Sequence, residues 1–348
     1  MKISAIFSQD RAINSLRKAY SSDRMGHSYI FCGADGVGKF TTASAWAKML
    51  LCENKTESTS SEIKTYDSCG KCRSCKVFDG GAHPDTHIIY KELSKYTKNG
   101  KGKTTPVDLP KDVITEFLID KAFSKPKMAD FSVYIVKESQ RLNPSSQNAL
   151  LKVLEEPPSY CVIILLCNSL EKLLPTIKSR CQILRFGEID ENIIVEKLVQ
   201  MSVAREEAVY WARFCESSLG KAITWSTLDV DETRIFELKK EFICKLAGLT
   251  LANCVDVGEW MGKTSKKISK AIIAETEGDS ASTTDINRKA AKLLIRMAMS
   301  AYSDVMRLSV GDTDNLINID QQHEIETLAG RLGPEAAADK ITKAYENM

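Results

Sequence analysis

The sequence lacks a strong net charge and lacks any long hydrophobic run. Lysine and arginine number 48 against 46 acidic residues, a net charge of +2. No global field therefore draws the chain towards nucleic acid or a membrane, and any DNA contact must be local or shared with partners. The longest wholly apolar run, Cys161–Cys167, is too short to span a bilayer, and the N-terminus lacks the apolar stretch of a signal peptide. We expect no membrane association and a cytoplasmic location.

Cysteine, in contrast, is plentiful, with 11 residues. In a cytoplasmic chain this number favours metal ligands or reduced thiols over disulfides. Cys69, Cys72 and Cys75 form two overlapping C-x-x-C steps, which suit tetrahedral Zn²⁺, and Cys52 can supply the fourth ligand. His83 is a weaker candidate ligand. The alternative, that these four are ordinary reduced cysteines, has less weight because thiols at this density have little packing use. The other cysteines are expected to fill the core.

Residues 33–40, GADGVGKF, have the G-x-x-x-x-G-K spacing of a phosphate-binding loop. In such a loop the backbone N–H groups and the following helix hold the phosphates, the lysine reaches the β and γ oxygens, and the next Ser or Thr coordinates Mg²⁺. Phe40 stands in that last position and offers no oxygen. The next hydroxyl, on Thr41, lies about 100° further around the helix, so it does not simply replace the ligand. The residues expected to line the pocket are Gly33, Gly36, Gly38, Lys39 and Thr41.

A second departure follows the expected strand Val133–Val136, where Lys137 precedes Glu138. In ATPases of this kind an aspartate at the first position holds the Mg²⁺ shell, and the following glutamate activates water. Phe40 and Lys137 thus remove ligands of the same ion, and we expect no unaided hydrolysis. One hypothesis is that the Lys137 ammonium takes the place of the cation and steadies an unhydrolysed nucleotide. Such binding should survive EDTA.

Length and pattern predict an α/β phosphate-loop domain followed by helical domains. At 348 residues the chain should form two or three domains. Short apolar runs alternate with helical patterns up to about residue 190, as in a parallel sheet flanked by helices, and residues 91–109 are expected to form a mobile surface loop. We predict a nucleotide-binding domain over 1–187 with a zinc module at 52–75, a helical lid over 188–228 and an all-α domain over 229–348. The expected strands are 29–32, 87–90, 133–136, 162–166 and 183–186.

Two further positions carry candidate functions. Asn168 follows the strand 162–166 and is placed to sense a γ-phosphate, although an asparagine there is more often an ordinary turn residue. Arg180 lies in Ser179-Arg180-Cys181, before the last strand. A lone surface arginine is usually just solvated.

Taken together, these motifs resemble the AAA+ subunits of bacterial sliding-clamp loaders. The resemblance includes GHSYIF before the phosphate loop, the cysteine module after its helix, NALLKVLEEPP and Ser179-Arg180-Cys181. It covers residues 1 to about 225 with specific motifs, and only helical pattern and length beyond. It implies that Arg180 acts in trans on ATP held by a neighbouring subunit, that Asn168 is a nucleotide sensor and that the four cysteines bind structural zinc. An arginine finger contributes about 10³–10⁵ to the rate of phosphoryl transfer.

The resemblance also implies partners. It predicts gamma/tau and delta subunits of DNA polymerase III, the sliding clamp, primed DNA within the complex, and a collar formed by the C-terminal domain. Gamma/tau subunits keep the metal ligands that Phe40 and Lys137 replace, so the departures favour a non-hydrolysing subunit. ATP or ADP is compatible with the pocket, whereas the missing ligands argue against Mg²⁺. Lys221 stands where active relatives carry an arginine sensor, and a lysine lacks the bidentate fork.

Three functions are compatible with these residues. The first choice is an interaction protein that positions Arg180 and hydrolyses little or no ATP itself. The second is an active gamma/tau-type ATPase with an unusual metal shell, which magnesium-dependent turnover lost on Lys39→Ala would support. The third is a stand-alone zinc-containing nucleic-acid binder, against which the near-neutral charge argues.

Overall fold

The computed structural model describes residues 1–60, 63–99, 106–275 and 283–347, and it divides into two compact units, Met1–Glu188 and Ile189–Met348. The three-part division at residues 187 and 228 stays a prediction. Within the described ranges, no helix has both the length and the apolar composition that a membrane span needs.

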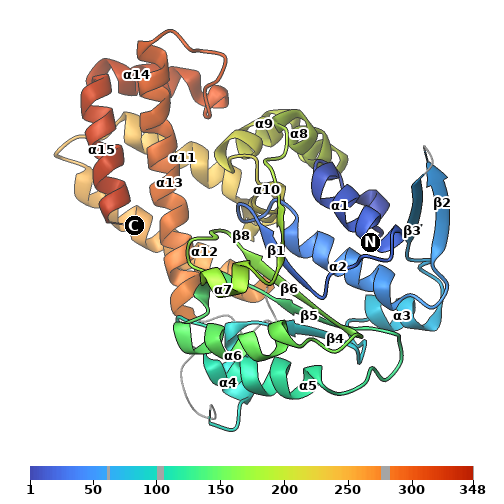
Figure 1. Cartoon of the computed structure of the whole chain (residues 1–348). Helices are drawn as coiled ribbons and strands as arrows, with labels where there is room; N and C mark the ends of the chain where they lie inside the picture. The colour runs from blue at the N-terminus through green and yellow to red at the C-terminus, as the bar shows by residue number, and fades with distance from the viewer. Residues whose placement is uncertain (61–62, 100–105, 276–282, 348) are drawn as a thin grey trace. The chain divides into compact units, whose positions relative to one another are not determined.

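The first unit is built on a five-stranded parallel sheet, as predicted (Figure 1). The strand order is β4-β5-β6-β1-β7, and every neighbouring pair is parallel. All residues of β6 are buried, as expected for a central strand covered on both faces. The predicted α/β fold class is therefore confirmed, and all five predicted strands are present. They are β1 (Ser28–Cys32), β4 (Thr86–Ile89), β5 (Ser132–Val136), β6 (Cys161–Cys167) and β7 (Gln182–Arg185).

Helices cover both faces of this sheet because successive strand residues point to opposite sides. Tyr29 and Phe31 of β1 pack with α1 (Asp10–Ser21) and α2 (Lys39–Leu51), whereas Ile30 packs with α4 (Lys111–Ile114) and α6 (Pro144–Glu155). Figure 1 shows α1 and α2 on one side of the sheet and α4 and α6 on the other. The helix α4 continues as the π-helical turn Thr115–Ile119 and α5 (Asp120–Ala122). The phosphate loop follows β1, which lies between β6 and β7, and leads directly into α2.

Several short elements of the first unit were not predicted. An antiparallel hairpin, β2 (Thr56–Ser60) and β3 (Ile63–Asp67), separates Cys52 from Cys69. The predicted mobile loop at 91–109 is wrong at its start, because residues 91–96 form a 3₁₀ helix in which Lys91 is buried. Its residues 100–105 lie outside the described ranges. The remaining short elements are Ile3–Ala5, α3 (Arg73–Asp79), Ser139–Arg141 and α7 (Pro175–Lys178).

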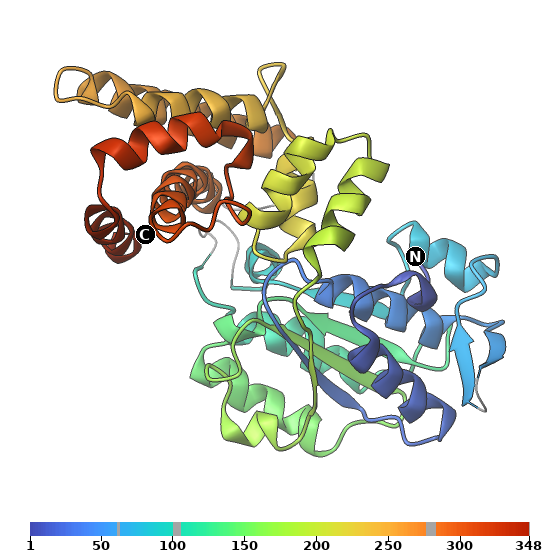
Figure 2. The same ribbon diagram turned by 90° about the horizontal axis from the view of Figure 1, so that it is seen from above.

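The second unit is mostly helical, as predicted. Its long α13 contacts α12, α14 and α15, and Figure 2 shows α14 and α15 alongside it. The predicted all-α region, 229–348, becomes helical only from Ile235, because β8 (Asp229–Val230) and β9 (Thr233–Arg234) form a tight hairpin in which Asp231 and Glu232 adopt positive φ. The helices are α8 (Glu191–Gln200), α9 (Arg205–Phe214), α10 (Leu219–Thr227), α11 (Ile235–Ala247), α12 (Cys254–Glu275), α13 (Thr283–Ser309), the 3₁₀ turn Ile319–Gln321, α14 (Gln322–Arg331) and α15 (Pro334–Glu346).

Candidate metal and nucleotide sites

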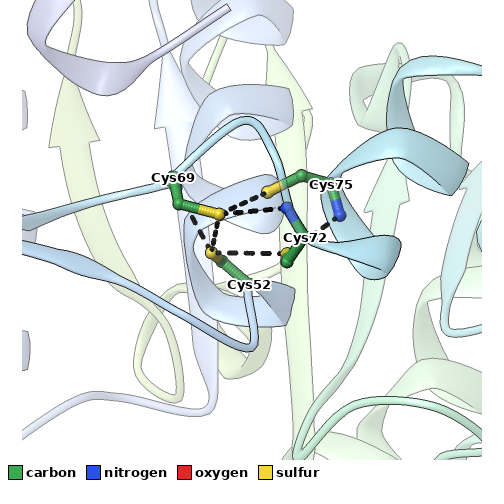
Figure 3. A group of neighbouring side chains, drawn as sticks. All are labelled: Cys52, Cys69, Cys72 and Cys75. Carbon is green, nitrogen blue, oxygen red and sulfur yellow. Dashed lines mark hydrogen bonds between the residues drawn. The ribbon is translucent and has the colours of Figure 1, made fainter.

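The four predicted cysteines converge into one cluster (Figure 3). Cys52 lies at the end of α2, and Cys72 and Cys75 lie at the start of α3, so two helix ends and the Cys69 turn bring the thiols together. All four Sγ atoms lie within 4.8 Å of one another, and three of the separations are 3.6, 3.9 and 4.0 Å. A tetrahedral Zn²⁺ with Zn–S bonds of about 2.3 Å requires Sγ separations of about 3.8 Å. The cluster therefore fits such an ion without rearrangement.

Backbone donors surround the cluster and show how it would hold negative charge. The N–H groups of Lys71 and Cys72 donate to Cys69 Sγ at 3.4 and 3.3 Å, and these bonds lower the pKa of Cys69 to about 6. Burial acts in the other direction on Cys52 and Cys75 and raises the pKa of both thiols. Two members thus resist ionisation until a cation compensates their charge.

His83 is not positioned as a ligand, so its weaker candidacy was wrong. Its Nδ1 accepts the N–H of Asp85 at 3.2 Å, which places the ring proton on Nε2, 3.0 Å from Ser74 Oγ. The Ser74 hydroxyl in turn donates to the Leu51 carbonyl at 2.7 Å. This buried chain fixes α3 against the end of α2 beside Cys52. Sequence reasoning missed Ser74, although it lies between Cys72 and Cys75.

The phosphate loop keeps its shape, but its lysine is turned onto the loop itself. A Cβ at Gly33 would lie 2.6 Å from the Phe186 carbonyl oxygen, so the close approach of β7 requires glycine there. Gly38 caps α2 with φ +96°, a conformation that side chains rarely adopt. The Lys39 ammonium donates to the carbonyls of Gly33 and Ala34 at 2.6 and 2.7 Å. A nucleotide phosphate would have to draw Lys39 away from these carbonyls.

The two departures from an ATPase pocket, Phe40 and Lys137, contact each other. The Lys137 ammonium lies 4.6 Å from the centre of the Phe40 ring and 5.6 Å from that of Tyr90, both within cation–π range. The contact arises because Tyr90 and Lys137 follow neighbouring parallel strands, with the Lys137 N–H donating to the Ile89 carbonyl at 2.8 Å. Sequence reasoning missed Tyr90. A fixed positive charge therefore lies against the residue that replaces the metal-binding hydroxyl.

The other residues predicted to contact nucleotide in the first unit lie in different surroundings. Thr41 is exposed on α2. Glu138, with φ 48°, pairs with Arg141 Nε at 3.2 Å, so the expected water-activating carboxylate already has a cationic partner. Asn168 follows β6 and is exposed, one residue after the carbonyl of Cys167 that accepts the Gly33 N–H.

Lys221 belongs to the second unit, in the first turn of α10. There it combines with burial to lower the pKa of Lys289. Its role as a sensor stays a prediction.

Arg180 lies just after α7, held by its own unit. Its backbone N–H donates to Ile177, one terminal nitrogen donates to the Thr176 carbonyl at 3.1 Å, and the other pairs with Glu155 Oε1 at 2.9 Å. The Arg180 side chain is still 36% exposed. The guanidinium is therefore ordered yet accessible at the surface. Glu155, which ends α6, is a further residue whose contact was not predicted.

The sequence model of the family described as "DNA polymerase III, delta subunit" matches residues 8–190, more than half of the chain. Among curated proteins, DNA polymerase III subunit delta' of Bacillus subtilis is 25% identical over 342 residues, covering 97% of this chain and 89% of the relative. The tau/gamma subunit of Haemophilus influenzae is 32% identical over 196 residues, covering 56% of this chain and 25% of the relative. Subunit delta' of Pseudomonas aeruginosa is 32% identical over 155 residues, covering 44% and 41%. The match thus spans nearly all of the Bacillus protein and less than half of the other two.

Proposed function

This chain belongs to the family described as DNA polymerase III, delta subunit, and on that premise we propose that it is a clamp-loader subunit of the delta-prime type. In this role it hydrolyses little or no ATP itself and supplies Arg180 to a neighbouring ATPase subunit. The Bacillus delta' protein matches along almost the whole chain, which supports the delta-prime type over gamma/tau.

The contact between Lys137 and Phe40 carries the proposal. A Mg²⁺ ion needs oxygen ligands at about 2.0–2.1 Å and is repelled by a neighbouring ammonium. The pocket lacks the hydroxyl and the aspartate and holds a lysine against the substituted ring. Because Glu138 is also paired with Arg141, neither the metal nor the attacking water has its usual partner. These features support a pocket that has lost hydrolysis and kept its fold.

Arg180 would then act on ATP bound by a neighbouring subunit. An exposed guanidinium that follows a short helix can reach a phosphate across a subunit boundary, where it would stabilise the charge that develops during phosphoryl transfer. We propose that a gamma/tau subunit binds the ATP to which that phosphate belongs. Delta, the sliding clamp and primed DNA complete the proposed assembly, which would work in the cytoplasm.

The cysteine cluster would hold a structural Zn²⁺. All four coordination positions would be filled by protein thiolates, leaving no open position for substrate, which is the arrangement of structural sites. The ion would fix α2, which carries the phosphate loop at its other end, to α3. In this role the metal supports the fold and takes no part in chemistry.

The test is a reconstituted clamp loader that contains this chain or its Arg180→Ala variant. ATP turnover at the site facing this chain should become nearly undetectable, so turnover of the assembly should fall by that site's share. Arg185→Ala, which removes another exposed arginine of the same segment, is the matched control and should change little. Unchanged turnover with Arg180→Ala would refute the proposed role, and loss of assembly would mean that Arg180 is structural.

The second function is an active ATPase with an altered metal shell, which the retained phosphate-loop lysine, Lys39, favours. Percentage identity does not separate the two functions, because the tau/gamma relative and the delta' protein of Pseudomonas aeruginosa are both 32% identical to this chain. The isolated chain distinguishes the two functions. Magnesium-dependent ATP turnover that disappears with Lys39→Ala would establish this alternative and overturn the first proposal.

A further inference from the structure

We propose that Glu155 is a positioning residue for Arg180. It would hold the guanidinium in the orientation in which it meets the phosphate of a neighbouring subunit. The inference rests on the proposed function of Arg180 and extends it to a second residue on a different helix. The motif NALLKVLEEPP contains Glu155, but neither its spacing nor the family match assigns that carboxylate a task.

Glu155 occupies a position that helix energetics alone would not favour. It is the last residue of α6, where the negative end of the helix dipole repels a carboxylate. The observed compensation is the Arg180 guanidinium at 2.9 Å. A carboxylate at this position is therefore better explained by its partner than by the stability of α6.

The end of α6 is a rigid support. Val153 and Leu154 are buried immediately before Glu155, and Pro157 and Pro158 prevent the helix from continuing. The carboxylate therefore projects from a fixed point of the first unit. Any side chain bound to it is fixed relative to the same core.

The Arg180 side chain is held at two points, which lowers the rotamer freedom that it would lose on binding a phosphate. Its long side chain has many rotamers, and fixing them is part of the free-energy cost of every contact that it makes. The Thr176 carbonyl and Glu155 each occupy a terminal nitrogen, which restricts the guanidinium before any partner arrives. The guanidinium has five N–H groups, so donors remain for a phosphate. Arg180 would thus meet the phosphate already ordered.

Shielding is the competing role for the same contact. If Glu155 chiefly neutralised Arg180, removing the carboxylate would release the finger and raise turnover. Both side chains are substantially exposed, at 49% and 36%, and ion pairs in water bind weakly. Because the phosphate would contact the N–H groups of Arg180 that Glu155 and Thr176 leave unused, shielding would be slight. Bracing predicts that removing the Glu155 carboxylate lowers ATP turnover, whereas shielding predicts that it raises turnover. The two roles can therefore be distinguished by experiment.

The experiment measures ATP turnover of the reconstituted clamp loader with Glu155→Ala and with Glu155→Gln. Bracing predicts that Glu155→Ala lowers kcat at the site facing this chain by about three- to ten-fold, because part of the rotamer restriction is lost, with KM for ATP unchanged. Glu155→Gln keeps an oxygen acceptor and should recover much of the loss. Glu156→Ala, which removes the neighbouring exposed carboxylate, should have little effect.

Two controls separate this inference from the proposed function. In an Arg180→Ala background, where turnover at the facing site is already nearly undetectable, Glu155→Ala should leave the turnover of the remaining sites unchanged, because the carboxylate acts only through the arginine. If Arg180→Ala itself has no effect, the proposed function fails. If Arg180→Ala lowers turnover while Glu155→Ala leaves it unchanged or raises it, the positioning role is overturned and Arg180 stands. The melting temperature of isolated Glu155→Ala should match that of the parent chain, which excludes a folding defect.

Discussion

The cysteine cluster and the phosphate loop lie at opposite ends of α2. The first has a complete set of candidate metal ligands, whereas the second has lost its expected ones. At the C-terminal end, four thiols converge with separations that suit Zn²⁺. At the N-terminal end, the loop keeps its glycines and lysine, while a cation–π contact between Lys137 and Phe40 stands where ligands of Mg²⁺ would be expected. One helix therefore connects a complete candidate metal site with one whose metal ligands have been replaced.

The difference shows that the conformation of the phosphate loop and its metal chemistry depend on different residues. The loop conformation depends on positions such as Gly33, where the backbone of Phe186, the residue after β7, allows no side chain. Metal binding depends on two side chains that can change without disturbing that backbone. Fold and nucleotide chemistry can therefore diverge in one motif, whereas the cluster's ligands would also serve its fold.

The largest expected effect would come from breaking the cysteine cluster. Cys72→Ser, or a strong chelator, should lower the free energy of unfolding by several kcal/mol, because a structural Zn²⁺ contributes about 10–16 kcal/mol in zinc-finger peptides. Denaturant unfolding with metal analysis would measure this. Cys254→Ser is the control, because Cys254 lies outside the cluster and, like Cys244, is exposed and does not fill the core as expected. A parent chain that contains no zinc and is indifferent to the chelator would contradict the metal site.

An intermediate effect is expected from restoring the lost ligands at the other end of α2. The double variant Phe40→Thr with Lys137→Asp should gain magnesium-dependent ATP affinity of about ten-fold or more, since both oxygen ligands return together. Each single variant should gain much less ATP affinity, because Phe40→Thr alone leaves the Lys137 ammonium in place and Lys137→Asp alone leaves the Phe40 ring. Titration calorimetry with Mg²⁺ and with EDTA would show this.

The parent chain provides the reference for that titration. Any nucleotide it binds should be held equally well in EDTA, as expected if Lys137 takes the place of the cation. Strict dependence on Mg²⁺ in the parent, or no gain in the double variant, would mean that Phe40 and Lys137 are not what excludes the metal.

The smallest effect should come from the cation–π contact itself. Lys137→Met keeps the apolar stem and removes the charge, and it should lower the free energy of unfolding by about 0.5–1 kcal/mol. Lys137→Arg, which keeps a cation above Phe40 and Tyr90, should lose less. Chemical denaturation of the three chains gives the comparison. Equal stability of all three would show that the contact contributes nothing measurable.

The fold was largely predictable because its signals are local. The five strands are apolar runs of the right length, and β1 leads directly into a recognisable loop. The cysteine cluster was predictable for the same reason, since three ligands lie within residues 69–75. The hairpin β2–β3 was missed because its polar strands carry no apolar alternation. The positive-φ turn at Asp231 and Glu232 likewise has no glycine to mark it.

Pairings between distant residues were not predictable. Nothing in the sequence brings Tyr90 to Lys137 or Glu155 to Arg180, because these contacts depend on which strands neighbour each other and where α6 ends relative to α7. His83, a weaker candidate ligand by sequence, has both ring nitrogens engaged in hydrogen bonds with Ser74 and Asp85.

The sequence alone determined which atoms this protein can offer: four thiols at ligand spacing, a phosphate loop, and a phenylalanine and a lysine in place of metal ligands. Tertiary structure alone decided which of these atoms meet. Residue type fixes the donors and charges of a side chain, whereas contacts across tens of residues depend on strand order and helix packing. For that reason the sequence identifies Phe40 and Lys137 as the residues that replace metal ligands, but only the folded chain shows that these two residues contact each other.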